Sequence, residues 1–118
     1  MKFDFPKVEK LKSQSRIEHL MAEGSSLKAF PVKVVYIKDE ALRHHQAGFS
    51  VPKRNFKLAV SRNRIKRQMK EAYRLHKHLL TNTNDEKFAM LFTYIGKDKI
   101  SYAQLEMNMQ FLMKKITE

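Results

Sequence analysis

The chain has 118 residues and carries 24 Lys and Arg against 12 Asp and Glu, a formal net charge of +12. Such a charge on a chain this short points to a polyanionic partner, with nucleic acid first and an anionic membrane surface or an acidic protein as alternatives. The absence of Cys excludes disulfides, thiolate zinc sites and thiol nucleophiles, and it fits a reducing cytoplasm. We expect one domain over 1–118 with an N-terminal arm at 1–9, and no membrane-spanning segment, because no apolar run approaches ~20 residues.

The first half of the chain predicts one helix and two strands. Residues 14–23 predict the helix, since Ser13 can cap its start and Gly24 can end it. A strand over 30–38 follows, rich in β-branched and aromatic residues, and then a second strand over 47–51. The short polar connection between these two strands favours an antiparallel arrangement.

The second half predicts two helices around a strand. The longest helical pattern covers 62–80, where apolar residues recur on one side. Residues 81–85 break it, and the almost continuously apolar run over 88–95 is typical of a central strand covered on both faces. Ser101 starts the last helix with Gln104 placed for a capping box. The order αββαβα, with an additional short strand left open, predicts an α/β (α+β) two-layer sandwich.

The polar residues form no catalytic pattern. The acidic pairs at 39–40 and 85–86 lie in polar connections, where such pairs are usually solvated. His76 and His78 are two residues apart on a predicted helix, so they lie on different sides of it and do not form a metal-binding pair. We therefore predict no catalytic residue and no metal ligand in the protein itself.

The informative stretch runs from Lys53 to Lys77, where Glu71 is the only acid. A solvated helix face normally mixes signs so that residues four apart can pair. Here like charges recur at that spacing, which costs stability unless an anion relieves the repulsion. Phosphate binding is the favoured interpretation, and a solvated basic face is the alternative. One third of the helix circumference carries Asn63, Lys66, Arg67, Lys70, Arg74 and Lys77.

The hexapeptide RNRIKR at 62–67 resembles the signature of the bacterial ribonuclease P protein subunit. That family has an Arg-Asn-Arg helix start followed by an apolar residue and Lys-Arg. The likeness covers about residues 8–116, with a first helix, strands and a last helix similar to those of the family. It departs from the family pattern where Ile17 and Met21 replace phenylalanines and where Pro52 replaces a Ser.

The resemblance implies a fold and a function. The fold would contain a left-handed βαβ crossover that presents the basic helix, although right-handed crossovers prevail in ~98% of cases. The protein would be a cytoplasmic subunit of the endonuclease ribonuclease P, with ribonuclease P RNA and precursor tRNA as partners, one protein per RNA and no membrane. The RNA subunit would carry out the cleavage with Mg²⁺, while the protein binds RNA, holds the 5′ leader of precursor tRNA and strengthens metal binding.

A non-enzymatic RNA-binding module, such as a ribosomal protein, is the alternative from another class. A helix-turn-helix regulator is disfavoured, because a strand and a basic loop precede the basic helix where such a regulator needs another helix.

Two surfaces follow from the resemblance. The RNA-binding surface would consist of Lys53, Arg54, Arg62, Asn63, Arg64, Lys66, Arg67, Lys70 and Arg74. A cleft for the single-stranded leader, between the first helix and the sheet, would consist of Ile17, Met21, Val34, Tyr36 and Phe49. Single strands are bound by stacking and by charge along the backbone. For Tyr36, ordinary core packing is an equal alternative.

Overall fold

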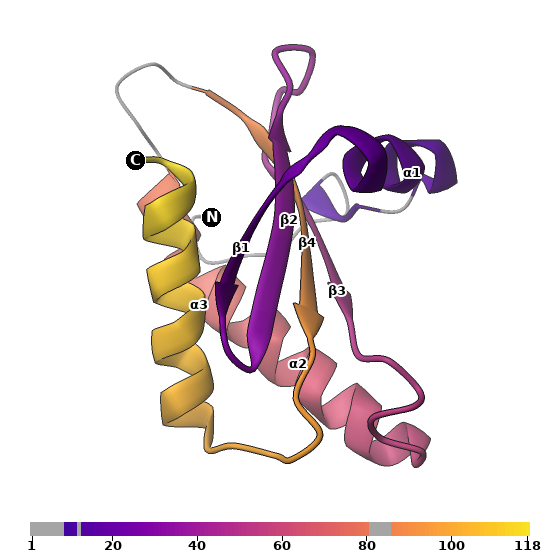
Figure 1. Cartoon of the computed structure of the whole chain (residues 1–118). Coiled ribbons are helices and arrows are strands. Elements are labelled where there is room, and N and C mark those ends of the chain that lie inside the picture. Colours follow the sequence, from indigo (N-terminus) through magenta and orange to yellow (C-terminus); the bar gives the residue numbers. More distant parts are fainter. Residues whose placement is uncertain (1–8, 12, 81–85) are drawn as a thin grey trace.

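The computed structural model describes residues 9–11, 13–80 and 86–118 (Figure 1). The predicted break at 81–85 and most of the predicted arm lie outside these residues. The elements in chain order are α1 (Gln14–Glu23), β1 (Ser25–Ala29), β2 (Val32–Lys38), β3 (Gln46–Ser50), α2 (Ala59–His76), the 3₁₀ helix η2 (Lys77–Leu80), β4 (Phe88–Tyr94) and α3 (Tyr102–Ile116).

The four strands form one sheet in the order β1-β2-β4-β3. Strands β1 and β2 form an antiparallel hairpin, β2 and β4 are also antiparallel, and β3 and β4 are parallel. The strands now seen as β2 and β3 run antiparallel, as predicted, but they are not neighbours, because β4 lies between them. Parallel neighbours need a long crossover, which α2 supplies between β3 and β4. The left-handed sense of that crossover stays a prediction of the resemblance.

Helices cover both faces of the sheet, and the mixed α/β class is confirmed (Figure 1). Even-numbered side chains of β2 and β4, such as Val34 and Phe92, face α2 and α3 and form the main core. Odd-numbered side chains, such as Val35 and Leu91, face α1 and form a smaller cluster with Leu20. This division follows from the strand period of two. The additional strand β1 extends the sheet at one edge.

Helix α1 begins and ends where the sequence predicts. The Ser13 Oγ accepts a hydrogen bond from the Arg16 N–H at 3.4 Å, and the Gly24 N–H donates to the Leu20 carbonyl at 2.8 Å. Gly24 has φ −76°, so it does not use the left-handed region. It is required for space, since a Cβ there would lie 2.5 Å from the Leu20 carbonyl oxygen and 2.9 Å from Val35 Cγ1.

Helix α2 begins three residues earlier than predicted, at Ala59. The sequence gives no cue for this start, because the N-cap residue Leu58 has no side-chain oxygen to bind the first N–H groups. The last four residues of the predicted helix form η2 instead. One stripe of α2 is buried against the sheet and α3: Ser61, Ile65, Met69, Ala72 and Tyr73.

Helix α3 starts at the predicted place, but only the Ser101 half of the predicted capping box is formed. The Ser101 Oγ accepts from the Gln104 N–H at 3.2 Å, while the Gln104 side chain donates to Asn108 at 3.1 Å. Leu105, Met109 and Leu112 are buried against the sheet and α2.

Candidate nucleic-acid interface

The side of α2 that faces away from the core is strongly basic. Asn63, Arg64, Arg67 and Lys70 are exposed, and Lys66 is half-buried. Within the described part of the chain, no carboxylate forms an ion pair with any of these cations. The first turn of α2 contains no acid, so the positive end of the helix dipole adds to the field of the side chains.

Arg62 has a different role from its neighbours. Its Nη1 donates to the carbonyl oxygens of Phe56 at 2.7 Å and Lys57 at 2.8 Å. Because α2 starts at Ala59, Arg62 lies at the end of the first turn and reaches back to the preceding loop. Arg62 was predicted to belong to the RNA-binding surface, but in the structure its guanidinium fastens this loop to the helix.

Arg74 is held by Glu71 on the same helix. The Arg74 Nη2 lies 2.6 Å from the Glu71 Oε2, and its Nε lies 3.2 Å from Oε1. The hydrogen bonds from Arg74 hold the pKa of Glu71 below its ordinary value. The charge of Arg74 is thus largely compensated by Glu71. We therefore expect Arg74 to contribute less to RNA binding than the other residues predicted for the RNA-binding surface.

The loop before α2 adds two exposed cations. Lys53 and Arg54 lie in a turn that is closed by a hydrogen bond from the Asn55 N–H to the Pro52 carbonyl at 3.1 Å. The Asn55 side chain donates to the Ile95 carbonyl at 3.3 Å and so ties this turn to the segment after β4. The basic surface is defined from here on as Lys53, Arg54, Arg64, Lys66, Arg67 and Lys70.

Three of the five residues predicted for the leader cleft lie on the face of the sheet opposite α1. Val34 is fully buried in the main core, on the face covered by α2 and α3. Phe49 stacks on Phe92 with ring centroids 5.6 Å apart, and Tyr36 packs edge-on against Phe88 at 6.3 Å. All three point away from α1, because the pleat sends alternate residues to opposite faces.

A cleft does lie on the α1 side of the sheet, and its volume is about 390 Å³. Met21, which is 55% exposed, forms its rim on α1. Ile17 instead packs against the smaller cluster. This α1-side cleft is lined by Met21, Lys33, Val35, Pro52, Arg54, Asn55, Thr93, Ile95 and Lys97.

The sequence contained a signal for this face. Lys33 lies between Val32 and Val34 in the strand, so its side chain is on the opposite face from theirs. A lysine rarely lies in a core unless it is paired. The face of β2 that carries Lys33 is therefore the open one, and the residues that share it, such as Val35, line the cleft. On β4, Thr93 is the pairing partner of Lys33 and therefore lies on the same open face.

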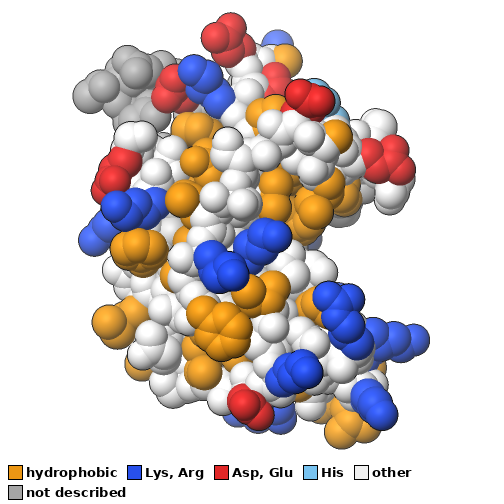
Figure 2. All heavy atoms as spheres, in the orientation of Figure 1, with side chains coloured by type: hydrophobic (Ala, Val, Ile, Leu, Met, Phe, Trp, Pro, Cys, Tyr) orange, Lys and Arg blue, Asp and Glu red, His pale blue; other side chains and the backbone are white. Residues whose placement is uncertain are grey.

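The cleft and the basic surface adjoin, since Arg54 belongs to both. Figure 2 shows Lys and Arg side chains gathered at the lower right, over the beginning of α2 and the segment before it. The outline is hollowed between this region and α1. An apolar floor beside several cations suits the bases and phosphates of a single-stranded nucleic acid.

Among the described residues there is no group of three or more His, Asp or Glu that could hold a metal ion. No helix in that part of the chain is long and apolar enough to cross a bilayer.

A basic helix start beside an open, partly apolar cleft defines a small α/β protein of the nucleic-acid-binding class. The sequence model of the family "Ribonuclease P" matches residues 5–117, and the chain belongs to this family.

Related sequences agree with this assignment. The ribonuclease P protein component of Porphyromonas gingivalis is 38% identical over 90 residues, which are 72% of this chain and 64% of that protein. That of Dictyoglomus thermophilum is 41% identical over 78 residues, 66% of this chain and 63% of that protein. The chain thus spans less than two thirds of the length of these relatives.

Solved structures share the fold. The RNase P protein of Thermotoga maritima superposes with a TM-score of 0.77 at 20% identity, covering 91% of this chain and 96% of that one. The RNase P protein of Staphylococcus aureus gives 0.74 at 21%, with 92% and 94% covered. At these identities the likeness concerns the fold alone.

Proposed function

We propose that this chain is the protein subunit of ribonuclease P, the endonuclease that removes the 5′ leader from precursor tRNA. The basic surface binds ribonuclease P RNA, and the α1-side cleft holds the single-stranded leader. The RNA subunit performs the hydrolysis with Mg²⁺ that it binds itself. The protein contributes by adding affinity for the precursor and by lowering the Mg²⁺ concentration that cleavage requires.

The observation that carries this proposal is the junction of the two surfaces at Arg54. Lys33 and Lys97 lie at the cleft, and Lys53 and Arg64 belong to the basic surface. A strand lying across Val35 would therefore have cations along its backbone and would lead toward the start of α2. A ribosomal protein needs a basic surface but has no need of an open cleft beside it.

The test is reconstitution with a bacterial ribonuclease P RNA. At a low Mg²⁺ concentration, where the RNA alone is nearly inactive, the purified protein should restore cleavage of precursor tRNA at the mature 5′ end. Equal amounts of an unrelated basic RNA-binding protein serve as the control. A protein that restores no more cleavage than this control would contradict the proposal.

The same experiment also tests whether the protein cleaves RNA in the absence of the RNA subunit. One structural neighbour is a Staphylococcus aureus RNase P protein mutant with defective mRNA degradation activity, so degradation of mRNA by the protein alone is a competing outcome. We expect nuclease-free preparations to cleave neither mRNA nor precursor tRNA. Specific cleavage by the RNA-free protein would show that the protein carries chemistry of its own.

A further inference from the structure

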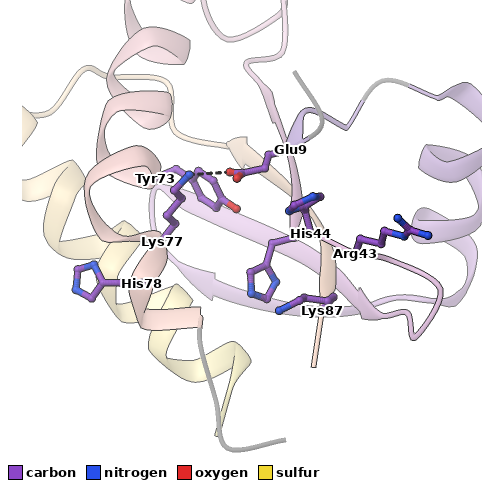
Figure 3. Close-up of a pocket in the computed structure, with 8 residues that line it drawn as sticks. Glu9, Arg43, His44, Tyr73, Lys77, His78 and Lys87 are labelled. Atoms are coloured by element: carbon purple, nitrogen blue, oxygen red, sulfur yellow. Dashed lines mark hydrogen bonds and ion pairs between the residues drawn. The ribbon is translucent and has the colours of Figure 1, made fainter. Parts of the chain in front are cut away.

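A second pocket lies at the other end of α2, away from the basic surface. Its volume is about 280 Å³, and it is formed where the end of α2, the loop before β3 and the start of β4 meet (Figure 3). Helix α2 has 18 residues and therefore spans about 27 Å at ~1.5 Å per residue. The pocket and the basic surface are thus separate sites on one molecule.

The lining of this pocket is predominantly cationic. Arg43, Lys77 and Lys87 contribute positive charges, and Glu9 is the one acid among the described residues that line the pocket. The Glu9 Oε1 accepts from the Lys77 Nζ at 2.9 Å, and both side chains are largely buried. With neutral histidines these described lining residues carry a net charge of +2, from three cations and one anion.

The histidines add hydrogen-bond donors to the same lining. The His45 Nδ1 accepts from the Phe88 N–H at 3.1 Å, so neutral His45 carries its proton on Nε2. The His45 ring is fixed in this orientation by stacking on Phe88, with centroids 5.8 Å apart and planes 8° from parallel. His44 and His78 also line the pocket.

Figure 3 shows how these groups are arranged. Tyr73 and Lys77 come from one side, from α2 and η2, while His44 and Lys87 come from the opposite side. Arg43 lies at the rim and directs its guanidinium outward; its long, exposed side chain can turn toward a bound group. Apart from Glu9 and Tyr73, the side chains of the described lining residues are cations or imidazoles, which are the groups that bind an oxyanion.

We propose that this pocket binds a backbone phosphate of the RNA partner, as a second contact about 20 Å along the helix axis from Arg64 of the basic surface. The proposal rests on the proposed function for its partner. The volume admits one phosphodiester with part of its sugar, whereas a folded protein segment would need a longer groove. Two contacts at opposite ends of one helix would fix the orientation of the protein on the RNA.

The test uses the full chain, a bacterial ribonuclease P RNA and inorganic phosphate. The double variant Arg43→Ala/Lys87→Ala removes two charges of the pocket, and Arg43→Lys/Lys87→Arg retains them. Lys114→Ala, on the exposed side of α3, is the control for loss of a charge elsewhere. Thermal unfolding of each variant confirms that it is folded before binding is measured.

We expect the double variant to bind the RNA about tenfold more weakly in ~0.15 M salt. Its slope of log K against log salt should be shallower by about 0.7–0.9, because one phosphate contact is lost. The charge-retaining variant and Lys114→Ala should bind like the wild type. Inorganic phosphate should shift the Phe88 amide resonance in the wild type but not in the double variant.

Unchanged RNA affinity and salt slope in the double variant would overturn the proposal, even if inorganic phosphate still shifted the Phe88 resonance, because the pocket would then hold free phosphate only. Failure of the proposed function is a different result. In that case the wild type would not distinguish ribonuclease P RNA from unrelated RNA, and the double variant would still test the pocket on the unrelated RNA.

Discussion

Arg62 and Arg67 carry the same charge on the same helix, yet the structure gives them different roles. The guanidinium of Arg62 holds two loop carbonyls, whereas Arg67 is exposed and belongs to the basic surface. We expect Arg62→Ala to lower the free energy of unfolding by about 1–2 kcal/mol, because two carbonyls lose their charged donor. Arg67→Ala should leave this free energy within ~0.5 kcal/mol of the wild type.

RNA binding should separate the same two variants. Arg67→Ala should weaken assembly with ribonuclease P RNA by about 1.5–3 kcal/mol, the range for a lost charge-assisted contact. Urea unfolding and RNA titration on each protein provide the two measurements. If Arg62→Ala unfolded like the wild type and lost RNA affinity as Arg67→Ala does, its assignment as a residue that positions the loop would be incorrect.

At the residue scale, the sequence predicts which cations of a helix are exposed better than it predicts which face of the sheet a strand residue lies on. The exposed cations Arg64, Arg67 and Lys70 follow from the helical period, since the apolar stripe fixes which side faces outward. The cleft residues did not follow, because Val34 and Val35 are equally apolar and only the neighbouring Lys33 distinguishes the two faces. The hydrogen bonds of Arg62 depend on where α2 begins, which no capping residue marks.

Gly24, between α1 and β1, is a test of packing at the element scale. A Cβ there would lie 2.5 Å from the Leu20 carbonyl, 2.9 Å from Val35 Cγ1 and 3.0 Å from the Tyr36 carbonyl. We expect Gly24→Ala to lower the free energy of unfolding by about 1–3 kcal/mol, because two of these three atoms are backbone and must move together with their elements.

The control for this prediction is Ser25→Ala at the neighbouring exposed position, which should change stability little. Urea unfolding at one temperature compares the two variants with the wild type. A Gly24→Ala protein as stable as Ser25→Ala would mean that α1 is not held as closely to β2 as the structure shows.

The Glu71–Arg74 pair on α2 predicts a small dependence of stability on pH. Since the pKa of Glu71 is lowered in the folded protein, its contribution is present above the ordinary glutamate pKa of ~4.3 and is lost as the pH falls through the folded value. Both side chains are partly exposed, so we expect Glu71→Gln to cost only about 0.3–0.5 kcal/mol at pH 7.

Urea unfolding of the wild type and Glu71→Gln at pH 7, 5, 4 and 3 checks this prediction. The difference between the two proteins should shrink below pH ~4.3 and approach zero at the acid end. A difference of constant size over the whole range would show that the substitution acts through packing or helix propensity.

Most elements could be predicted, but their pairing could not. The periods of α1, α2 and α3 and the apolar run of β4 are local properties, and each is found within a few residues of its predicted place. The neighbours of β4 depend on the crossover through α2, which no local pattern encodes. Strand β1 could not be predicted firmly, because its five residues, SSLKA, show little alternation of apolar and polar side chains.

For the whole molecule, the net charge of +12 predicts salt-dependent association. Six cations form the basic surface, and each phosphate contact contributes a slope of ~0.7–0.9, so log K against log salt should fall by about 4–5 per unit. Titrations of ribonuclease P RNA between ~0.05 and ~0.4 M salt measure this slope. A flat dependence would mean that the charge serves solvation and not binding.

The proposed function requires that the α1-side cleft holds the leader of precursor tRNA. The most direct measurement compares the affinity of the reconstituted holoenzyme for precursor and for mature tRNA, using the wild type, Lys33→Ala/Lys97→Ala and the control Lys114→Ala on the exposed side of α3. We expect the cleft variant to bind precursor tRNA about tenfold more weakly, ~1.4 kcal/mol, with mature tRNA binding and the Lys114→Ala protein unchanged. Equal losses on precursor and mature tRNA, or no loss on either, would contradict the assignment of the cleft to the leader.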